Sequence, residues 1–143
     1  MHEAYLGDRI IPIPLSKEPL MTEIYEIRLD DKFGQLQRFD VATEAAAVTE
    51  RWFNQTLTTV KDSVVRLGVV EGEFHWHKHE AEDEFFLVVK GELQIDIEDH
   101  ETIALRPNQG VTIPKGVMHR PRAPERTIIL MVEPATVIPT GDS

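Results

Sequence analysis

The chain has 143 residues, a net charge of −10 and no cysteine. This length suits one domain with a real core, and its contents of 41% hydrophobic and 28% charged residues are ordinary globular values. The negative charge disfavours nucleic acid and anionic membrane surfaces as partners, and the lack of cysteine excludes disulfides and thiolate metal sites. Without an apolar run of spanning length or a secretory signal, we expect a cytoplasmic protein with no membrane partner.

Residues 1–55 are predicted to form an N-terminal arm and one short helix. Prolines exclude a long helix from the first 38 residues, and residues 24–29 alternate as a strand does. The helix is predicted over 43–53, with Thr43 as its cap, Glu44 in its first turn and Trp52 on its apolar face. We expect it to lie across the outside of the domain, anchored by Trp52.

Residues 56–133 carry short strands at regular spacing, which predicts an all-β barrel or sandwich. The predicted strands are Thr56–Val60, Ser63–Val70, Glu73–Lys78, Glu84–Lys90, Glu92–Glu98, Glu101–Leu105, Gly110–Ile113 and Thr127–Glu133. Residues 134–143 are expected to form a C-terminal arm, so the whole chain, 1–143, reads as a single domain.

Four potential metal ligands fall on or beside these strands: His77, His79, Glu84 and His119. His77 and His79 are two residues apart, so on a strand they point the same way. Glu84 opens the next strand, and His119 follows a strand end and a turn. Imidazole and carboxylate together suit one divalent ion, with Fe, Mn, Ni, Co and Zn all compatible, and leave one or two positions for water or substrate.

Alternation also predicts an inward position for His75 and Glu73, which share the parity of His77. His75 is open to three interpretations: a further ligand, a proton shuttle or a buried hydrogen-bonded residue. His75 and Glu73 are therefore the first catalytic bases to test. Phe74 and Trp76 have the opposite parity, which predicts an outer face that the arm, the helix or a second subunit covers.

Other side chains are predicted to line or flank the barrel interior. The apolar set expected to point inward is Phe86, Val88, Leu93, Ile95, Ile97, Val111 and Ile113. The cations available for an acidic ligand are Arg66, Arg120 and Arg122. The last two flank Pro121 beside His119, where they lie either at the mouth of the site or on the ordinary surface.

The ligand pattern resembles the two motifs of the cupin superfamily. Gly72, His77-Lys78-His79, Glu84 and Gly91 match the first motif, with one residue fewer than usual before the histidine pair. Pro114, Gly116 and His119 match the second motif. Asn108 replaces its opening glycine, a mild departure because Asn tolerates a left-handed backbone, and Ala123 stands where an Asn often follows.

The resemblance implies a small jelly-roll barrel (a double-stranded β-helix) that binds a metal and forms a homodimer. The Trp-bearing helix predicted before the barrel and residues 140–142 also resemble short mannose-6-phosphate-isomerase-like cupins. Two functions remain open: a metal-dependent isomerase, lyase or oxygenase acting on a small molecule such as a sugar derivative or organic acid, and a non-catalytic binding or sensing barrel. A polar group beside the open metal position would favour proton transfer, whereas apolar walls alone would favour binding or oxygen chemistry.

Overall fold

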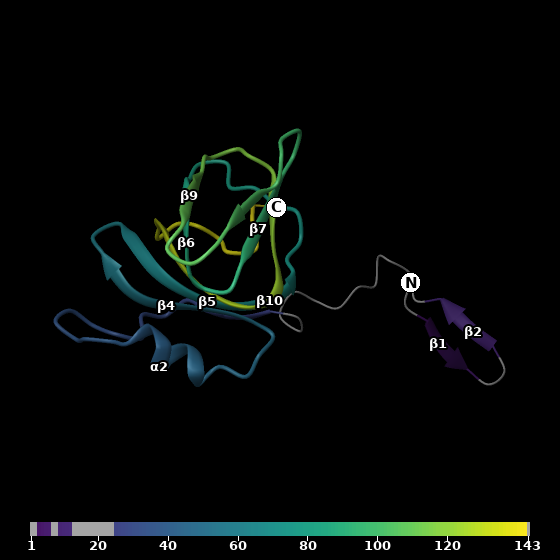
Figure 1. The fold of residues 1–143 in the computed structure, drawn as a ribbon, viewed down its shortest axis with the longest axis horizontal. Helices are drawn as coiled ribbons and strands as arrows, with labels where there is room; N and C mark the ends of the chain where they lie inside the picture. Colours follow the sequence, from purple (N-terminus) through teal and green to yellow (C-terminus); the bar gives the residue numbers. More distant parts are fainter. Residues whose placement is uncertain (1–2, 7–8, 13–24, 143) are drawn as a thin grey trace.

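The computed structural model describes residues 3–6, 9–12 and 25–142. Strands β1 (Glu3–Leu6) and β2 (Arg9–Pro12) form an antiparallel pair of their own. Strand β3 (Glu26–Arg28) falls within the predicted strand of residues 24–29, although residue 24 lies outside the described residues. It runs parallel to the first barrel strand, so this part of the arm belongs to the main sheet (Figure 1).

The predicted all-β jelly roll is confirmed. Its strands are β4 (Trp52–Val60), β5 (Ser63–Glu73), β6 (Glu84–Lys90), β7 (Leu93–Ile97), β8 (Ile103–Leu105), β9 (Gly110–Ile113) and β10 (His119–Pro134). The first half of β10 pairs with β7, and its second half lies between β5 and β6. A register shift between Ala123 and Thr127 separates the two halves, so one bent strand joins both sides of the barrel.

The predicted helix exists, but it is shorter and starts earlier than the sequence indicates. Helix α2 spans Val41–Ala46, and Asp40 rather than Thr43 is its N-cap: the Asp40 carboxylate accepts a hydrogen bond from the Thr43 amide at 2.8 Å. Ala45 packs with Phe53 on the outer face of the sheet, so the predicted position outside the barrel is correct (Figure 1). Within the described residues, no helix combines the length and hydropathy needed to cross a membrane.

Trp52 is not the anchor of this helix. It is the first residue of β4, 6% exposed, and packs inside the barrel against Tyr25 and Phe74. Pairing of β4 with β5 overrides the weak helical pattern here, because a sheet partner and an apolar interior stabilise an aromatic residue better than one exposed helical turn. The interior positions predicted for Phe86, Val88, Leu93 and Ile95 are confirmed, since all are 2% exposed or less.

Candidate metal centre

His77, His79, Glu84 and His119 converge in the barrel interior, and one ligand atom from each lies within 4.8 Å of the others. The Glu84 Oε1 atom lies 3.5 Å from His79 Nε2 and 3.4 Å from His119 Nε2. His77 and His119 form an isolated bridge with two backbone hydrogen bonds, and the Gly116 amide donates to the His79 carbonyl. The turn of the second motif is thereby tied directly to the first.

Backbone carbonyls fix the tautomers of two of these histidines. The His77 Nδ1–H donates to the His75 carbonyl at 3.0 Å, and the His119 Nδ1–H donates to the Val117 carbonyl at 2.9 Å. Since a carbonyl can only accept, each Nδ1 carries the proton and each Nε2 keeps a free lone pair. This arrangement orients metal-binding imidazoles in proteins.

The charges and vacant lone pairs also fit a divalent ion. Burial, and then the neighbouring His119, lower the pKa of His77 to about 4, so its imidazole is neutral at pH 7. Burial would raise the pKa of Glu84, but the adjacent imidazoles of His119 and His79 outweigh it and hold that pKa below its ordinary value. Buried Glu84 Oε1, His79 Nε2 and His119 Nε2 have no hydrogen-bond partner within the described residues, and these are the atoms that a cation would bind.

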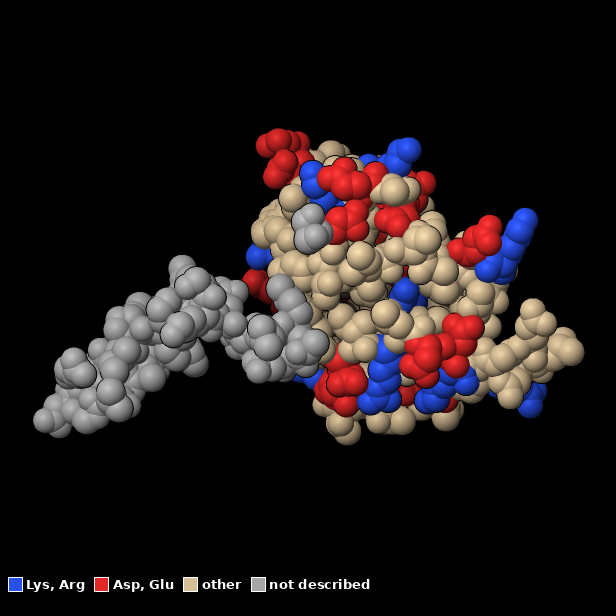
Figure 2. All heavy atoms as spheres, turned by 180° about the vertical axis from the view of Figure 1, so that it is seen from behind, with Lys and Arg blue, Asp and Glu red and all other residues tan. Residues whose placement is uncertain are grey.

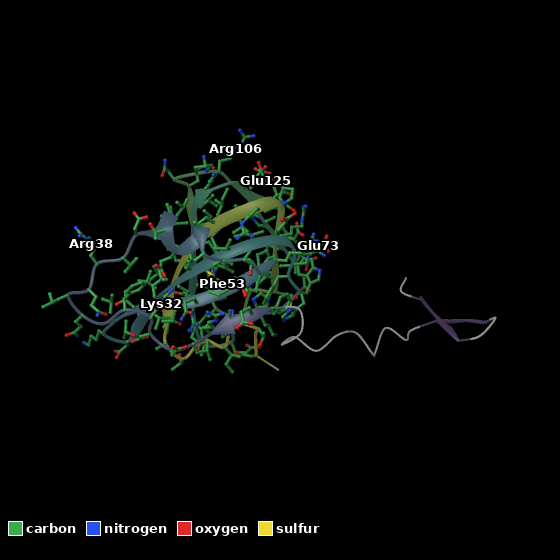
Figure 3. The ribbon with its side chains drawn as sticks, turned by 90° about the horizontal axis from the view of Figure 1, so that it is seen from below. Lys32, Arg38, Phe53, Glu73, Arg106 and Glu125 are labelled. Carbon is green, nitrogen blue, oxygen red and sulfur yellow. The ribbon has the colours of Figure 1, made fainter. Side chains whose placement is uncertain are left out.

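The structure brings His75 near the ligands but leaves Glu73 outside. His75 is half-buried; its Nε2 donates to the Thr140 carbonyl at 2.6 Å, and its Nδ1 lies 3.3 Å from the Tyr25 hydroxyl. This matches the hydrogen-bonded interpretation of His75. The predicted inward position of Glu73 is wrong, because its side chain is 64% exposed and pairs with Arg120 on the surface (Figure 3).

A β-bulge explains why the alternation of side chains along a strand predicted the wrong face for Glu73. Glu73 pairs with Arg122 and His77 pairs with His119, so four residue steps on one strand face three on the other. The extra residue reverses the alternation between Phe74 and His77. Phe74 therefore points inward, 7% exposed, against its predicted outer position, whereas Trp76 is 45% exposed as predicted.

The two arginines beside His119 make surface ion pairs. Arg122 Nε and Arg120 Nη2 each lie 2.8 Å from Asp96 Oδ2, and Arg120 also covers the ring of Trp76. The surface interpretation of Arg120 and Arg122 is therefore the one that the structure supports. On the face drawn in Figure 2, basic side chains likewise lie among acidic ones.

Arg66 lies inside the barrel as half of a buried ion pair. Its Nε is 2.8 Å from Glu133 Oε1, and the two side chains are 3% and 0% exposed. Arg66 Nη1 also donates to Thr56 Oγ1 at 3.0 Å, and the Glu133 carboxyl group lies beside that of Glu84. A polar chain thus runs from the candidate ligand across β10 and β5 to β4. Sequence reasoning missed Glu133, although its parity with Ile129 and Met131 on one strand would have placed it inside.

A small cavity of about 30 Å³ lies beside the candidate ligands and reaches His77 and Glu84. Its apolar walls include Trp52, Val70, Phe74, Phe86, Ile129 and Met131. Among the described residues that line it, Asn54 is the one polar side chain that is not a ligand. Asn54 is 9% exposed, and its Oδ1 has no hydrogen-bond partner within the described residues. Sequence analysis missed Asn54 because the predicted helix ended at residue 53 and the first predicted barrel strand began at residue 56, so Asn54 lay in neither element.

A jelly-roll barrel with three histidines and one glutamate inside defines the cupin class of proteins. The chain belongs to the Cupin domain family, whose model matches residues 63–133. YdbB of Bacillus subtilis, an uncharacterised protein, is 46% identical over 89 residues, which cover 62% of this chain and 79% of YdbB.

Two further similarities show how far the likeness reaches. A solved cupin-2 domain containing protein from Shewanella frigidimarina has 35% identity and a TM-score of 0.64, covering 67% of this chain and 93% of the other. A mannose-1-phosphate guanylyltransferase from Sinorhizobium fredii is 40% identical over 57 residues, which is 40% of this chain but 11% of that enzyme. The latter similarity is confined to a small part of a much longer protein.

Proposed function

We propose that this cupin binds one divalent ion through His77, His79, Glu84 and His119 and catalyses an oxygenase-type reaction on a small molecule. The single observation that carries the choice of reaction is the lining of the cavity. Apart from the ligands, the one polar side chain among the described residues of its lining is the neutral amide of Asn54, which cannot act as a base. Isomerases and lyases that move protons need such a base, whereas oxygen chemistry needs free positions on the ion.

When bound, the ion would supply a Lewis acid with coordination positions for substrate oxygen and for dioxygen. The protein's own part is to hold, orient and exclude water. His77 and His119 keep their Nε2 lone pairs directed inward, Glu84 supplies one negative charge, and the apolar walls hold the body of the ligand. Asn54 is the group available to fix the orientation of that ligand by a hydrogen bond.

The catalytic roles of His75 and Glu73 stay predictions, and the structure gives them unequal support. Both ring nitrogens of His75 have neighbours other than the cavity, and Glu73 is on the surface. If the reaction were proton transfer after all, His75→Gln would lower kcat while the matched surface variant Glu73→Gln would not. Equal activity of both variants would support the oxygenase proposal.

A metal titration followed by an oxygen-uptake assay tests the proposal. Protein purified without chelator or metal-affinity tag is analysed for metals, then loaded anaerobically with Fe, Mn, Ni, Co or Zn. We expect about one ion per chain and oxygen uptake by the iron or manganese form with small phenols or organic acids. His119→Ala should lose the ion, whereas the matched control His100→Ala should keep it, because His100 is exposed.

The alternative function is a binding or sensing barrel without catalysis. Metal uptake without oxygen consumption or any other turnover would favour that alternative, and failure of every ion to bind would refute the metal site itself.

We further propose that the protein acts as a cytoplasmic homodimer with the exposed Trp76 at its interface. The sugar-derivative substrates implied by mannose-6-phosphate-isomerase-like cupins remain a narrower prediction to screen alongside the acids.

A further inference from the structure

Residues 140–142 of the C-terminal segment lie alongside the run of histidines in the first motif. The Thr140 carbonyl accepts the hydrogen bond of His75 Nε2. Gly141, with φ of +95°, packs so closely on His77 that a Cβ built on it would lie 2.5 Å from the His77 Cβ. Only glycine fits at this position, so the backbone of the segment is pressed against a metal ligand.

Asp142 completes this contact around the third histidine. Its amide donates to the Lys78 carbonyl at 3.0 Å, and its Oδ2 accepts from the Glu80 amide at 2.7 Å. Both residues that flank His79 are therefore bonded to Asp142, which fixes the position of its carboxylate.

His79 differs from the other two histidine ligands in one respect. The Nδ1 atoms of His77 and His119 have carbonyl acceptors, but the His79 Nδ1 has no hydrogen-bond partner within the described residues. The His79 residue is 2% exposed, so water does not readily satisfy this atom. When Nε2 binds an ion, Nδ1 must carry the proton, and a buried N–H requires an acceptor.

Two carboxylates lie near this ring: those of Glu82 and Asp142 each have an oxygen within 4.8 Å of a ring nitrogen of His79. Asp142 is held in place by its bonds to Lys78 and Glu80, whereas the Glu82 side chain forms no hydrogen bond in the part of the chain that the structure describes. The fixed carboxylate loses less side-chain entropy when it accepts a bond, so Asp142 is the better acceptor.

We propose that Asp142 accepts the Nδ1–H of His79 and is thereby a positioning residue of the metal centre. The bond fixes the tautomer of His79 and increases its basicity, as carboxylates behind metal-bound histidines do. The C-terminal segment is then part of the metal centre. This inference rests on the proposed metal site.

Matched variants of the full chain test the role of Asp142. Asp142→Ala and Glu82→Ala each remove one carboxylate from the same neighbourhood, so any effect of net charge on Zn²⁺ affinity is similar. We expect Asp142→Ala to weaken Zn²⁺ binding about 10- to 100-fold in a chelator competition, and Glu82→Ala to change it much less. The melting temperature of each metal-free variant reports whether the fold itself is damaged.

A second measurement does not depend on any variant folding. In the zinc-loaded wild-type protein, long-range ¹H–¹⁵N NMR should show a slowly exchanging Nδ1–H on His79, unlike the exposed His100. Rapid exchange at His79, or equal affinities of the two alanine variants, would overturn the role of Asp142. Failure of the wild-type protein to bind Zn²⁺ or any other divalent ion would instead refute the metal site, so the two failures are distinguishable.

Discussion

Replacing Arg66 by Met is expected to destabilise the barrel by about 3–5 kcal/mol, because it leaves a buried negative charge without compensation. Arg66 is 2% exposed, pairs with Glu133 at 2.8 Å and donates to Thr56 at 3.0 Å. The methionine keeps most of the apolar bulk of the side chain. The predicted loss therefore arises from charge and hydrogen bonding rather than from a large cavity.

Replacing Glu133 by Gln is expected to cost only about 1 kcal/mol or less in the metal-free protein. Burial raises the pKa of Glu133, and the negative charge of Glu84 raises it further, although Arg66 opposes both effects. The two buried carboxyl groups of Glu133 and Glu84 therefore share one negative charge, which faces Arg66. A glutamine offers the same pattern, with an N–H for Glu84 and a carbonyl oxygen for Arg66.

The assay is urea unfolding at pH 7 of metal-stripped wild type, Arg66→Met, Glu133→Gln and the double variant. Metal is removed because an ion that binds the folded protein would itself raise the free energy of unfolding. Equal m-values are needed for the comparison. If Glu133→Gln costs as much as Arg66→Met, Glu133 is ionised and the charge assignment is wrong.

The metal ligands, the exposed tryptophan and Asp96 provide further tests. His77→Ala or His119→Ala should abolish metal retention after dialysis while circular dichroism still reports a folded barrel; full occupancy in either variant would mean that the site is misassigned. Trp76→Glu should weaken the proposed dimer, since this side chain is 45% exposed, and an unchanged dimer in dilute sedimentation runs would remove Trp76 from the interface. A hydrogen bond from Arg122 is the main cause that holds the pKa of Asp96 below its ordinary 3.8. The ionised Asp96 therefore stabilises the folded protein above pH 3.8, and this contribution is lost as the pH falls through the pKa of the folded state. Asp96→Asn should thus destabilise the protein by about 1–3 kcal/mol at pH 7, with a difference that shrinks below about pH 4 in acid unfolding curves, and a constant difference would contradict the ion-pair argument.

The four candidate ligands were predictable as a group because they fall within two recognisable sequence motifs. His77 and His79 are two residues apart, and the Pro114–Gly116 turn that carries His119 back is encoded by its own residues. Asn108 is a similar case: its φ of +71° confirms that it takes over the left-handed position of the missing motif glycine. Such features depend on short stretches of chain, and a sequence contains them directly.

The position of Glu73 was not predictable from alternation, because a bulge is a property of two strands. The extra residue between Glu73 and His77 exists only relative to Arg122 and His119, which lie more than 40 residues later. The same reasoning applies to Trp52, whose place in β4 depends on pairing with Val70. Tertiary pairing, rather than the local pattern, determined both outcomes.

Residues outside the two motifs therefore carry the information that the motifs lack. The quartet is compatible with many metals and reactions, so it cannot select among them. In the proposed site, Asn54 on β4 is the polar group of the cavity wall, Glu133 on β10 adjoins Glu84, and Asp142 near the C-terminus adjoins His79. These three residues lie beside the site but outside both motifs. Substituting them should therefore change the reaction or the metal affinity while the two motifs stay intact.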